Sequence, residues 1–204
     1  MKIVYIYILL IYAYIYPVIY QLPNTLYAME PAWSLDGTKI AFASRLLSSD
    51  DDDIWYISSN GLDSPVRLTT DPSDDTAPAW VPNSNKISFI SERQPYGIYT
   101  HDLSNGAETL IIPDGSCHSW SPEGNKIVYS KYVNGNTDLY IKDMTSGVET
   151  RLTTDPDQDA WPDWSHDGLK IVYDIGDVNP TMWVIPATGG SPMQVPLDYG
   201  YFPK

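Results

Sequence analysis

Four stretches of the chain repeat one pattern, in which a tryptophan is followed by a polar turn, a lysine and a short apolar run. They are "PAWSLDGTKIAF" at 31–42, "PAWVPNSNKISF" at 78–89, "HSWSPEGNKIVY" at 118–129 and "PDWSHDGLKIVY" at 162–173. The Asp-Gly or Asn-containing segment after the tryptophan suits a hairpin turn, because these residues tolerate positive φ. The β-branched and aromatic run that follows suits a half-buried strand.

Each stretch is followed by two further strand signals. The first set is "DIWYIS" at 53–58, "GIYTHDL" at 97–103, "DLYIKDM" at 138–144 and "TMWVIPA" at 181–187. The second set is "VRLTT" at 66–70, "ETLII" at 108–112, "TRLTT" at 150–154 and "MQVPL" at 193–197. Each unit therefore predicts four short antiparallel strands, which is the composition of a β-propeller blade. A β-sandwich would not need the same sequence at a fixed period.

The spacing of the repeat explains a longer phrase that occurs twice. "RLTTDPSDDTAPAW" begins at Arg67, and "RLTTDPDQDAWPDW" begins at Arg151, 84 residues later. The repeat tryptophans Trp33, Trp80, Trp120 and Trp164 are 47, 40 and 44 residues apart. The phrase therefore spans the exit of one unit and the entry of the next, and its two copies are two periods apart. We expect the four tryptophans to pack between neighbouring blades, where a large ring fills a wedge-shaped gap.

These copies resemble the WD-repeat-like, Pro-Asp-type blades of TolB-like propellers, which also occur in the propellers of prolyl-oligopeptidase and dipeptidyl-peptidase relatives. The resemblance covers roughly residues 31–200 and implies an all-β propeller. TolB-type propellers usually have six blades, whereas four are recognisable in this sequence. Three alternatives stay open: the four blades close on themselves, partial rings self-associate between chains, or the gene is a truncated piece.

The first twenty residues, "MKIVYIYILLIYAYIYPVIY", carry a single charge at Lys2. A basic start, an apolar run and the small residue Ala28 indicate an export signal or a membrane anchor over residues 1–28, with propeller blades over 29–204. Pro17 and the alternating tyrosines weaken this interpretation. Because "KIVY" recurs at Lys126 and Lys170, a decayed repeat is the alternative. The uncharged length favours the signal or anchor, and hence an extracytoplasmic location: periplasmic, secreted or anchored.

Composition narrows the classes of partner. The 26 Asp and Glu residues against 12 Lys and Arg give a net charge of −14. Such a chain repels nucleic-acid backbones and anionic lipids, so neither is expected as a partner. A single cysteine, Cys117, allows no intramolecular disulfide and no Cys-rich zinc site.

Acidic residues gather in two kinds of connection that emerge at the same end of a four-stranded blade: the loop between its second and third strands and the link to the next blade. This acidic rim comprises Asp50, Asp51, Asp52, Asp53, Asp71, Asp74, Asp75, Asp155, Asp157, Asp159, Asp174 and Asp177. It is either a solvated face or a docking face for a basic protein or peptide. The candidate partner-binding residues are Asp51, Asp52, Asp74, Asp75, Asp157 and Asp159, all expected to lie in loops.

Metal and catalytic motifs are weak. "DPDQD" at Asp155 has the alternation of a calcium loop, but Ala160 replaces the required glycine and His166 the final glutamate. "NGNTD" at Asn134 is equally incomplete. There is no Gly-x-Ser-x-Gly elbow, phosphate-binding loop or dinucleotide fingerprint, so we expect no metal and no cofactor.

The neighbours Cys117 and His118 should point to opposite faces of a strand, which argues against a catalytic pair. His118 stands where the other three copies have proline, and we expect it near the mouth of the central channel.

Two functions remain. In the family that the blades resemble, the propeller is a periplasmic interaction hub of the cell envelope, which implies a non-enzymatic, exported or membrane-anchored module that binds other proteins. The alternative is an accessory or truncated propeller of a peptidase or polysaccharide-degrading enzyme system. Four concurring blades specify a fold, but the same blades serve many roles.

Overall fold

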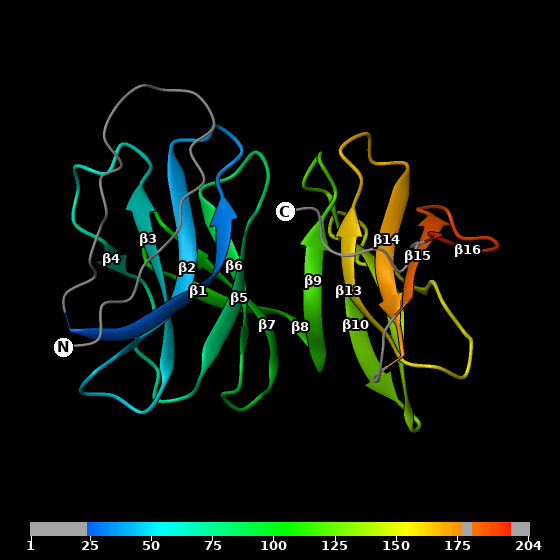
Figure 1. Ribbon diagram of the computed structural model, residues 1–204, viewed down its shortest axis with the longest axis horizontal. Coiled ribbons are helices and arrows are strands. Elements are labelled where there is room, and N and C mark those ends of the chain that lie inside the picture. Colours follow the sequence, from blue (N-terminus) through cyan, green and yellow to red (C-terminus); the bar gives the residue numbers. More distant parts are fainter. Residues whose placement is uncertain (1–23, 177–180, 197–204) are drawn as a thin grey trace. The chain divides into compact units, whose positions relative to one another are not determined.

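The computed structural model describes residues 24–176 and 181–196, and these residues contain β-strands and turns but no helix. The strands follow the four repeats in order (Figure 1). The first eight are β1 (Thr25–Trp33), β2 (Lys39–Leu46), β3 (Asp52–Ser58), β4 (Val66–Arg67), β5 (Asp75–Trp80), β6 (Lys86–Ser91), β7 (Gly97–Asp102) and β8 (Glu108–Pro113). The next eight are β9 (Gly115–Trp120), β10 (Lys126–Val133), β11 (Asn136–Asp143), β12 (Glu149–Arg151), β13 (Asp159–Trp164), β14 (Lys170–Ile175), β15 (Thr181–Pro186) and β16 (Met193–Gln194).

The strands form four sheets of four, each with its strands hydrogen-bonded in chain order and antiparallel. We call them blade 1 (β1–β4), blade 2 (β5–β8), blade 3 (β9–β12) and blade 4 (β13–β16). The prediction of four four-stranded antiparallel propeller blades is confirmed. Blades 1 and 2 belong to one compact unit, and blades 3 and 4 belong to a second.

The predicted hairpin turns join the first two strands of each blade. In blade 1, the side chain of Asp36 accepts hydrogen bonds from Ser34 Oγ (2.7 Å) and from the backbone N–H of Thr38 (3.0 Å). Gly37 then has a φ of 67°, a conformation that glycine adopts without steric cost. Blade 4 repeats these bonds with Ser165 and Asp167. The turn therefore follows from the Asp-Gly pair, as predicted.

Each unit is held together by an apolar layer between its two blades. In the first unit, Ala43 and Ile54 of blade 1 pack against Ile87 and Phe89 of blade 2, and all four are fully buried. In the second unit, Val128 and Leu139 of blade 3 pack against Ile171, Tyr173 and Ile185 of blade 4. Burying each large side chain contributes roughly 1.5–3 kcal/mol.

The predicted inter-blade role of the tryptophans is seen most clearly at Trp80. Its ring meets that of Tyr56 edge-on at 6.5 Å, and its Nε1–H donates to the carbonyl of Ala32 at 3.0 Å. Trp164 also packs against the apolar layer of the second unit, but its indole N–H makes no hydrogen bond within the described residues. Trp33 differs, because no described blade precedes blade 1, and its side chain is 50% exposed.

The first strand of every blade contains a bulge that the repeat pattern did not predict. The residue three positions before each repeat tryptophan has positive φ: 54° at Glu30, 50° at Ala77, 20° at Cys117 and 54° at Trp161. The pairing with the second strand shifts register at these points. A residue with a side chain is strained in this region by about 1–3 kcal/mol, so the surrounding sheet must stabilise it.

The predicted signal or anchor over 1–28 lies mostly outside the described residues, which begin at 24. Its last residues form the start of β1, where Ala28 pairs with Ser44, and Tyr27 Oη donates to Asp52 Oδ1 at 2.9 Å. The blade therefore begins a few residues before the predicted boundary at 29. No helix in the described part of the chain has the length and apolar character to cross a membrane.

Candidate functional site

The structure divides the acidic rim into buried and exposed carboxylates. Asp52, Asp75 and Asp159 begin strands β3, β5 and β13, and their exposed fractions are 4%, 0% and 0%. The prediction that all six candidate residues lie in loops is therefore wrong for these three. Each strand starts earlier than its apolar run indicates, and the first carboxylate of the strand turns inward.

Asp52 lies in a small network on blade 1. Arg45 Nη2 is 3.0 Å from Asp52 Oδ2 and 3.2 Å from Asp74 Oδ1. Asp74 Oδ1 also accepts the backbone N–H of Asp52 at 2.8 Å. Two of the candidate residues thus share one arginine, and Asp74, which is half-buried, attaches the link between blades 1 and 2 to β3.

The repeated "RLTT" phrase forms a second network, which we call the Arg-Thr clasp. In blade 1 it consists of Asp53, Arg67 and Thr69; in blade 3 it consists of Asp138, Arg151 and Thr153. Arg67 pairs with Asp53 at 2.5 Å, and Arg151 pairs with Asp138 at 2.7 Å.

The two clasps also share the hydrogen bonds that the threonine and arginine side chains make to the backbone. The hydroxyl of Thr69 accepts the N–H of Ile54 at 2.9 Å, and that of Thr153 accepts the N–H of Leu139 at 3.0 Å. Each arginine Nε–H donates to the carbonyl of its threonine. Burial raises the pKa of Asp53 to about 6 although Arg67 opposes the shift.

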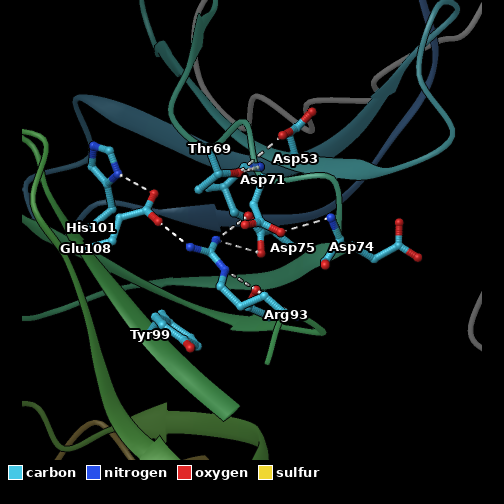
Figure 2. A network of polar contacts seen from close by, with 12 residues as sticks. Asp53, Thr69, Asp71, Asp74, Asp75, Arg93, Tyr99, His101 and Glu108 are labelled. Atoms are coloured by element: carbon cyan, nitrogen blue, oxygen red, sulfur yellow. Dashed lines mark hydrogen bonds and ion pairs between the residues drawn. The ribbon is translucent and has the colours of Figure 1, made fainter. Parts of the chain in front are cut away.

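Arg93 holds the third network, on blade 2 (Figure 2). Its Nη2 donates to both oxygens of Asp75, at 2.9 and 3.1 Å, and its Nη1 is 2.5 Å from Glu108. The guanidinium carbon lies 4.8 Å from the ring centre of Tyr99 and 5.6 Å from that of Phe89. The carboxylate of Glu108 in turn contacts His101 Nδ1 at 3.1 Å. Asp75 is therefore a structural ion-pair partner rather than a surface group.

Asp159 occupies in blade 4 the position that Asp75 occupies in blade 2. Both are the first residue of the first strand, and both are fully buried. Thr153 and Asp155 lie beside Asp159, but neither oxygen of its carboxylate makes a hydrogen bond of ordinary geometry within the described part of the chain. Burial raises the pKa of this carboxyl from 3.8 to about 7.

The remaining rim residues meet solvent to different degrees. Asp50 and Asp157 are exposed, whereas Asp51, Asp71, Asp74, Asp155 and Asp174 are half-buried. Asp51 lies 3.9 Å from Arg67 in a long ion pair. Asp177 lies outside the described residues. Of the six candidates for partner binding, Asp157 is the most accessible.

His118 lies in β9, where it pairs with Tyr129 of β10. Burial of its ring lowers the imidazole pKa from 6.5 to about 4, so the ring is neutral at physiological pH. Cys117 is a free, half-buried thiol. No cluster of three or more His, Cys, Asp or Glu side chains with the arrangement of a metal site occurs in residues 24–176 and 181–196. The role of His118 at a channel mouth stays a prediction.

Sequence comparison finds relatives among known proteins but no family model. No protein-family model matches the chain. The uncharacterized protein Atu1656 of Agrobacterium fabrum is 29% identical over 168 residues, which are 76% of this chain and 53% of that protein. The Tol-Pal system protein TolB of Ruthia magnifica is 31% identical over 104 residues, which are 48% of this chain and 24% of that protein. The chain thus spans about half the length of the first relative and about a quarter of the second.

Solved structures show the same fold. TolB from Acinetobacter baumannii matches with a TM-score of 0.73 and 23% identity over 89% of this chain and 45% of that one. Enzymes also match: a Mycobacterium tuberculosis puromycin-hydrolyzing peptidase with a TM-score of 0.71, and an oligogalacturonate lyase with 0.68, each at 15% identity. They cover 91% and 86% of this chain, and 32% and 55% of their own. The resemblance to TolB-like propellers that the blade sequences predict is confirmed.

Proposed function

We propose, from the TolB-like architecture of its blades, that this chain is a non-enzymatic protein-interaction module that acts outside the cytoplasm. Its partner is a basic protein or peptide, and the exposed carboxylates of the acidic rim attract it. The TolB relatives support the interaction role. The apolar start of the sequence supports an exported or anchored location.

The separation of buried from exposed carboxylates is the observation that carries this proposal. Arg45, Arg67, Arg93 and Arg151 are each engaged by a buried aspartate, so they do not neutralise the outer surface. Asp50 and Asp157 face solvent, and the whole chain carries a net charge of −14. Such a field raises the rate at which a cationic partner associates more than it strengthens the final complex.

A defined basic peptide tests the proposal before any natural partner is known. A synthetic peptide that alternates arginine and glycine is immobilised, and its association with the full chain is followed by surface plasmon resonance at increasing salt. We expect the association rate to fall as salt rises, because the Debye length shrinks to about 8 Å at physiological ionic strength. Replacing both Asp50 and Asp157 by Asn should slow association further.

The matched control removes the same number of negative charges outside the acidic rim. Asp63→Asn with Glu123→Gln removes two exposed carboxylates from turns that are not part of the acidic rim. If the control pair slows association as much as the rim pair, only net charge matters, and the acidic rim is not the docking face.

The enzymatic alternative is tested directly. The peptidase and lyase neighbours share the fold at 15% identity, which carries no catalytic residue over to this chain. We expect no hydrolysis of puromycin and no cleavage of oligogalacturonate by the purified chain. Turnover of either compound that survives further purification would overturn the non-enzymatic assignment.

A further inference from the structure

Three of the four blades contain a cation that lies on an aromatic ring next to a carboxylate. Arg45 of blade 1 lies 5.8 Å from the ring of Tyr27 and pairs with Asp52. Arg93 of blade 2 lies 4.8 Å from Tyr99 and pairs with Asp75. In blade 3, Lys131 lies 5.7 Å from Tyr140 and 3.4 Å from Glu149. Each cation comes from the second strand or from the residues that directly follow it.

Blade 4 has the acid and the aromatic rings of this arrangement. Asp159 matches Asp75 at the start of the first strand. Tyr173 and Trp183 pair across β14 and β15 as Phe89 and Tyr99 pair across β6 and β7. In blade 2, Arg93 contacts both of these rings as well as the carboxylate.

Blade 4 does not have the cation. Arg151 at the end of blade 3 is close enough to interact with the charge of Asp159, but its ion pair is with Asp138, at 2.7 Å. The only lysine of β14 is its first residue, Lys170, at the end of the strand opposite to Ile175, which pairs with Asp159. The sequence contains no lysine or arginine from Ile171 to Pro203, so neither the rest of β14 nor the segment that follows it supplies one.

The result is visible at Asp159, which is fully buried and, beside Thr153 and Asp155, makes no hydrogen bond of ordinary geometry through either oxygen within the described residues. The hydroxyl of Tyr173, 1% exposed, has no partner there either. A buried carboxylate is strongly disfavoured unless a cation or donors compensate it.

We propose that blade 4 receives this cation from outside, as the arginine side chain of a partner peptide, bound by Asp159 between the rings of Tyr173 and Trp183. This inference rests on the proposed function and names the chemistry of its partner. Arginine suits the position better than lysine, because its flat guanidinium stacks on aromatic faces, pairs with both oxygens of a carboxylate and is weakly hydrated.

The blade 2 site shows that such burial is compatible with a bound guanidinium. Asp75 is 0% exposed, and the side chain of Arg93 on it is only 16% exposed. An arginine that enters blade 4 from outside must first displace the side chains that cover Asp159. Its affinity is lowered by the cost of that opening.

The probe is N-acetyl-argininamide, and N-acetyl-citrullinamide is its neutral counterpart of nearly the same shape. Binding to the full chain is followed in ¹⁵N-correlated NMR spectra through the indole N–H of Trp183, which is assigned with Trp183→Phe. We expect saturable shifts with a Kd of roughly 1 mM for the arginine compound and none for the citrulline compound. Asp159→Asn should weaken binding about tenfold or more, because the ionic partner is lost.

The exposed neighbour Asp157 provides the control of equal charge. Asp157→Asn should leave the affinity for N-acetyl-argininamide within about twofold of that of the unaltered chain. Tyr173→Phe keeps the ring and gives a second variant that should fold if Asp159→Asn does not; it should still bind the probe.

Three results would overturn the proposal: equal shifts from both probes, shifts at Trp183 that Asp159→Asn leaves unchanged, or no shift at Trp183. None of them bears on the acidic rim, because the test of that surface uses Asp50 and Asp157. A chain whose association with the basic peptide is unchanged by salt and by the rim changes, but which still binds N-acetyl-argininamide, refutes the proposed function alone.

Discussion

Replacing Asp159 by Asn should make the second unit more stable at alkaline pH. The folded-state pKa of this carboxyl is raised by burial to about 7 from 3.8. An acid with a raised folded-state pKa destabilises the fold as pH rises, since above 3.8 the unfolded chain loses its proton first. The loss in the free energy of unfolding increases between about pH 4 and pH 7 and stays constant above pH 7.

The three-unit difference in pKa sets the size of the effect. At 1.36 kcal/mol for each unit, it amounts to about 4 kcal/mol at most, and to about 2 kcal/mol if solvent partly screens the ionised group. Asn keeps nearly the same shape without a charge. We therefore expect Asp159→Asn to be as stable as the unaltered chain near pH 4, and about 2–4 kcal/mol more stable near pH 8.

Urea unfolding at a series of pH values, followed by tryptophan fluorescence, measures this difference. If the two units unfold at different urea concentrations, only the transition of the second unit should respond. Asp157→Asn, an exposed change of the same kind, should keep the pH profile of the unaltered chain within about 0.5 kcal/mol. A profile for Asp159→Asn that runs parallel to that of the unaltered chain, or a lower stability near pH 8, would refute the reasoning.

Three further changes test the networks and the core. Trp80→Ala removes an inter-blade ring and its hydrogen bond, and calorimetry should show a loss of about 3–5 kcal/mol, whereas Trp33→Ala at an exposed ring should cost under about 1 kcal/mol. Thr69→Val leaves the buried N–H of Ile54 without its acceptor and should cost about 1–3 kcal/mol in urea unfolding; Thr70→Val, at an exposed position, should be nearly neutral. Arg93→Met leaves the buried Asp75 uncompensated and should cost about 3–5 kcal/mol near pH 7. The cost should be smaller near pH 4, because burial raises the pKa of the Asp75 carboxyl and protonation removes the uncompensated charge. Equal effects at pH 7 and pH 4 would count against an ionic role for Arg93.

The sequence was sufficient to predict the sheets, because the strands and turns of a blade are specified by residues that are close together in the sequence. Asp-Gly turns, β-branched runs and a tryptophan at a fixed period specify which segments are strands and which are neighbours. The bulges at Glu30, Ala77 and Trp161 were missed. Their only signal is the proline that follows each of them, and proline at that point fits a bulge, a turn or the edge of a strand.

The candidate site was harder to predict, because the direction of one side chain depends on where its strand begins. A shift of one residue turns Asp52 from a loop carboxylate into the partner of Arg45. The pairings could have been suspected from the repeated "RLTT" phrase, in which a basic residue precedes an acidic link at both copies. The missing cation of blade 4 has no local signal. It becomes visible only when the four blades are compared in register.

The position of the Arg-Thr clasp has a consequence for how the number of blades can increase by gene duplication. The clasp closes blade 1 onto the link to blade 2, and blade 3 onto the link to blade 4. The segment from β8 into β9 reads "ETLIIPDGSC" and has no copy of the clasp sequence. The element that recurs is therefore a pair of blades with one clasp inside it. A gene that lengthens by copying this pair adds blades two at a time. Propellers of four and six blades would then be successive members of one series, separated by a single duplication.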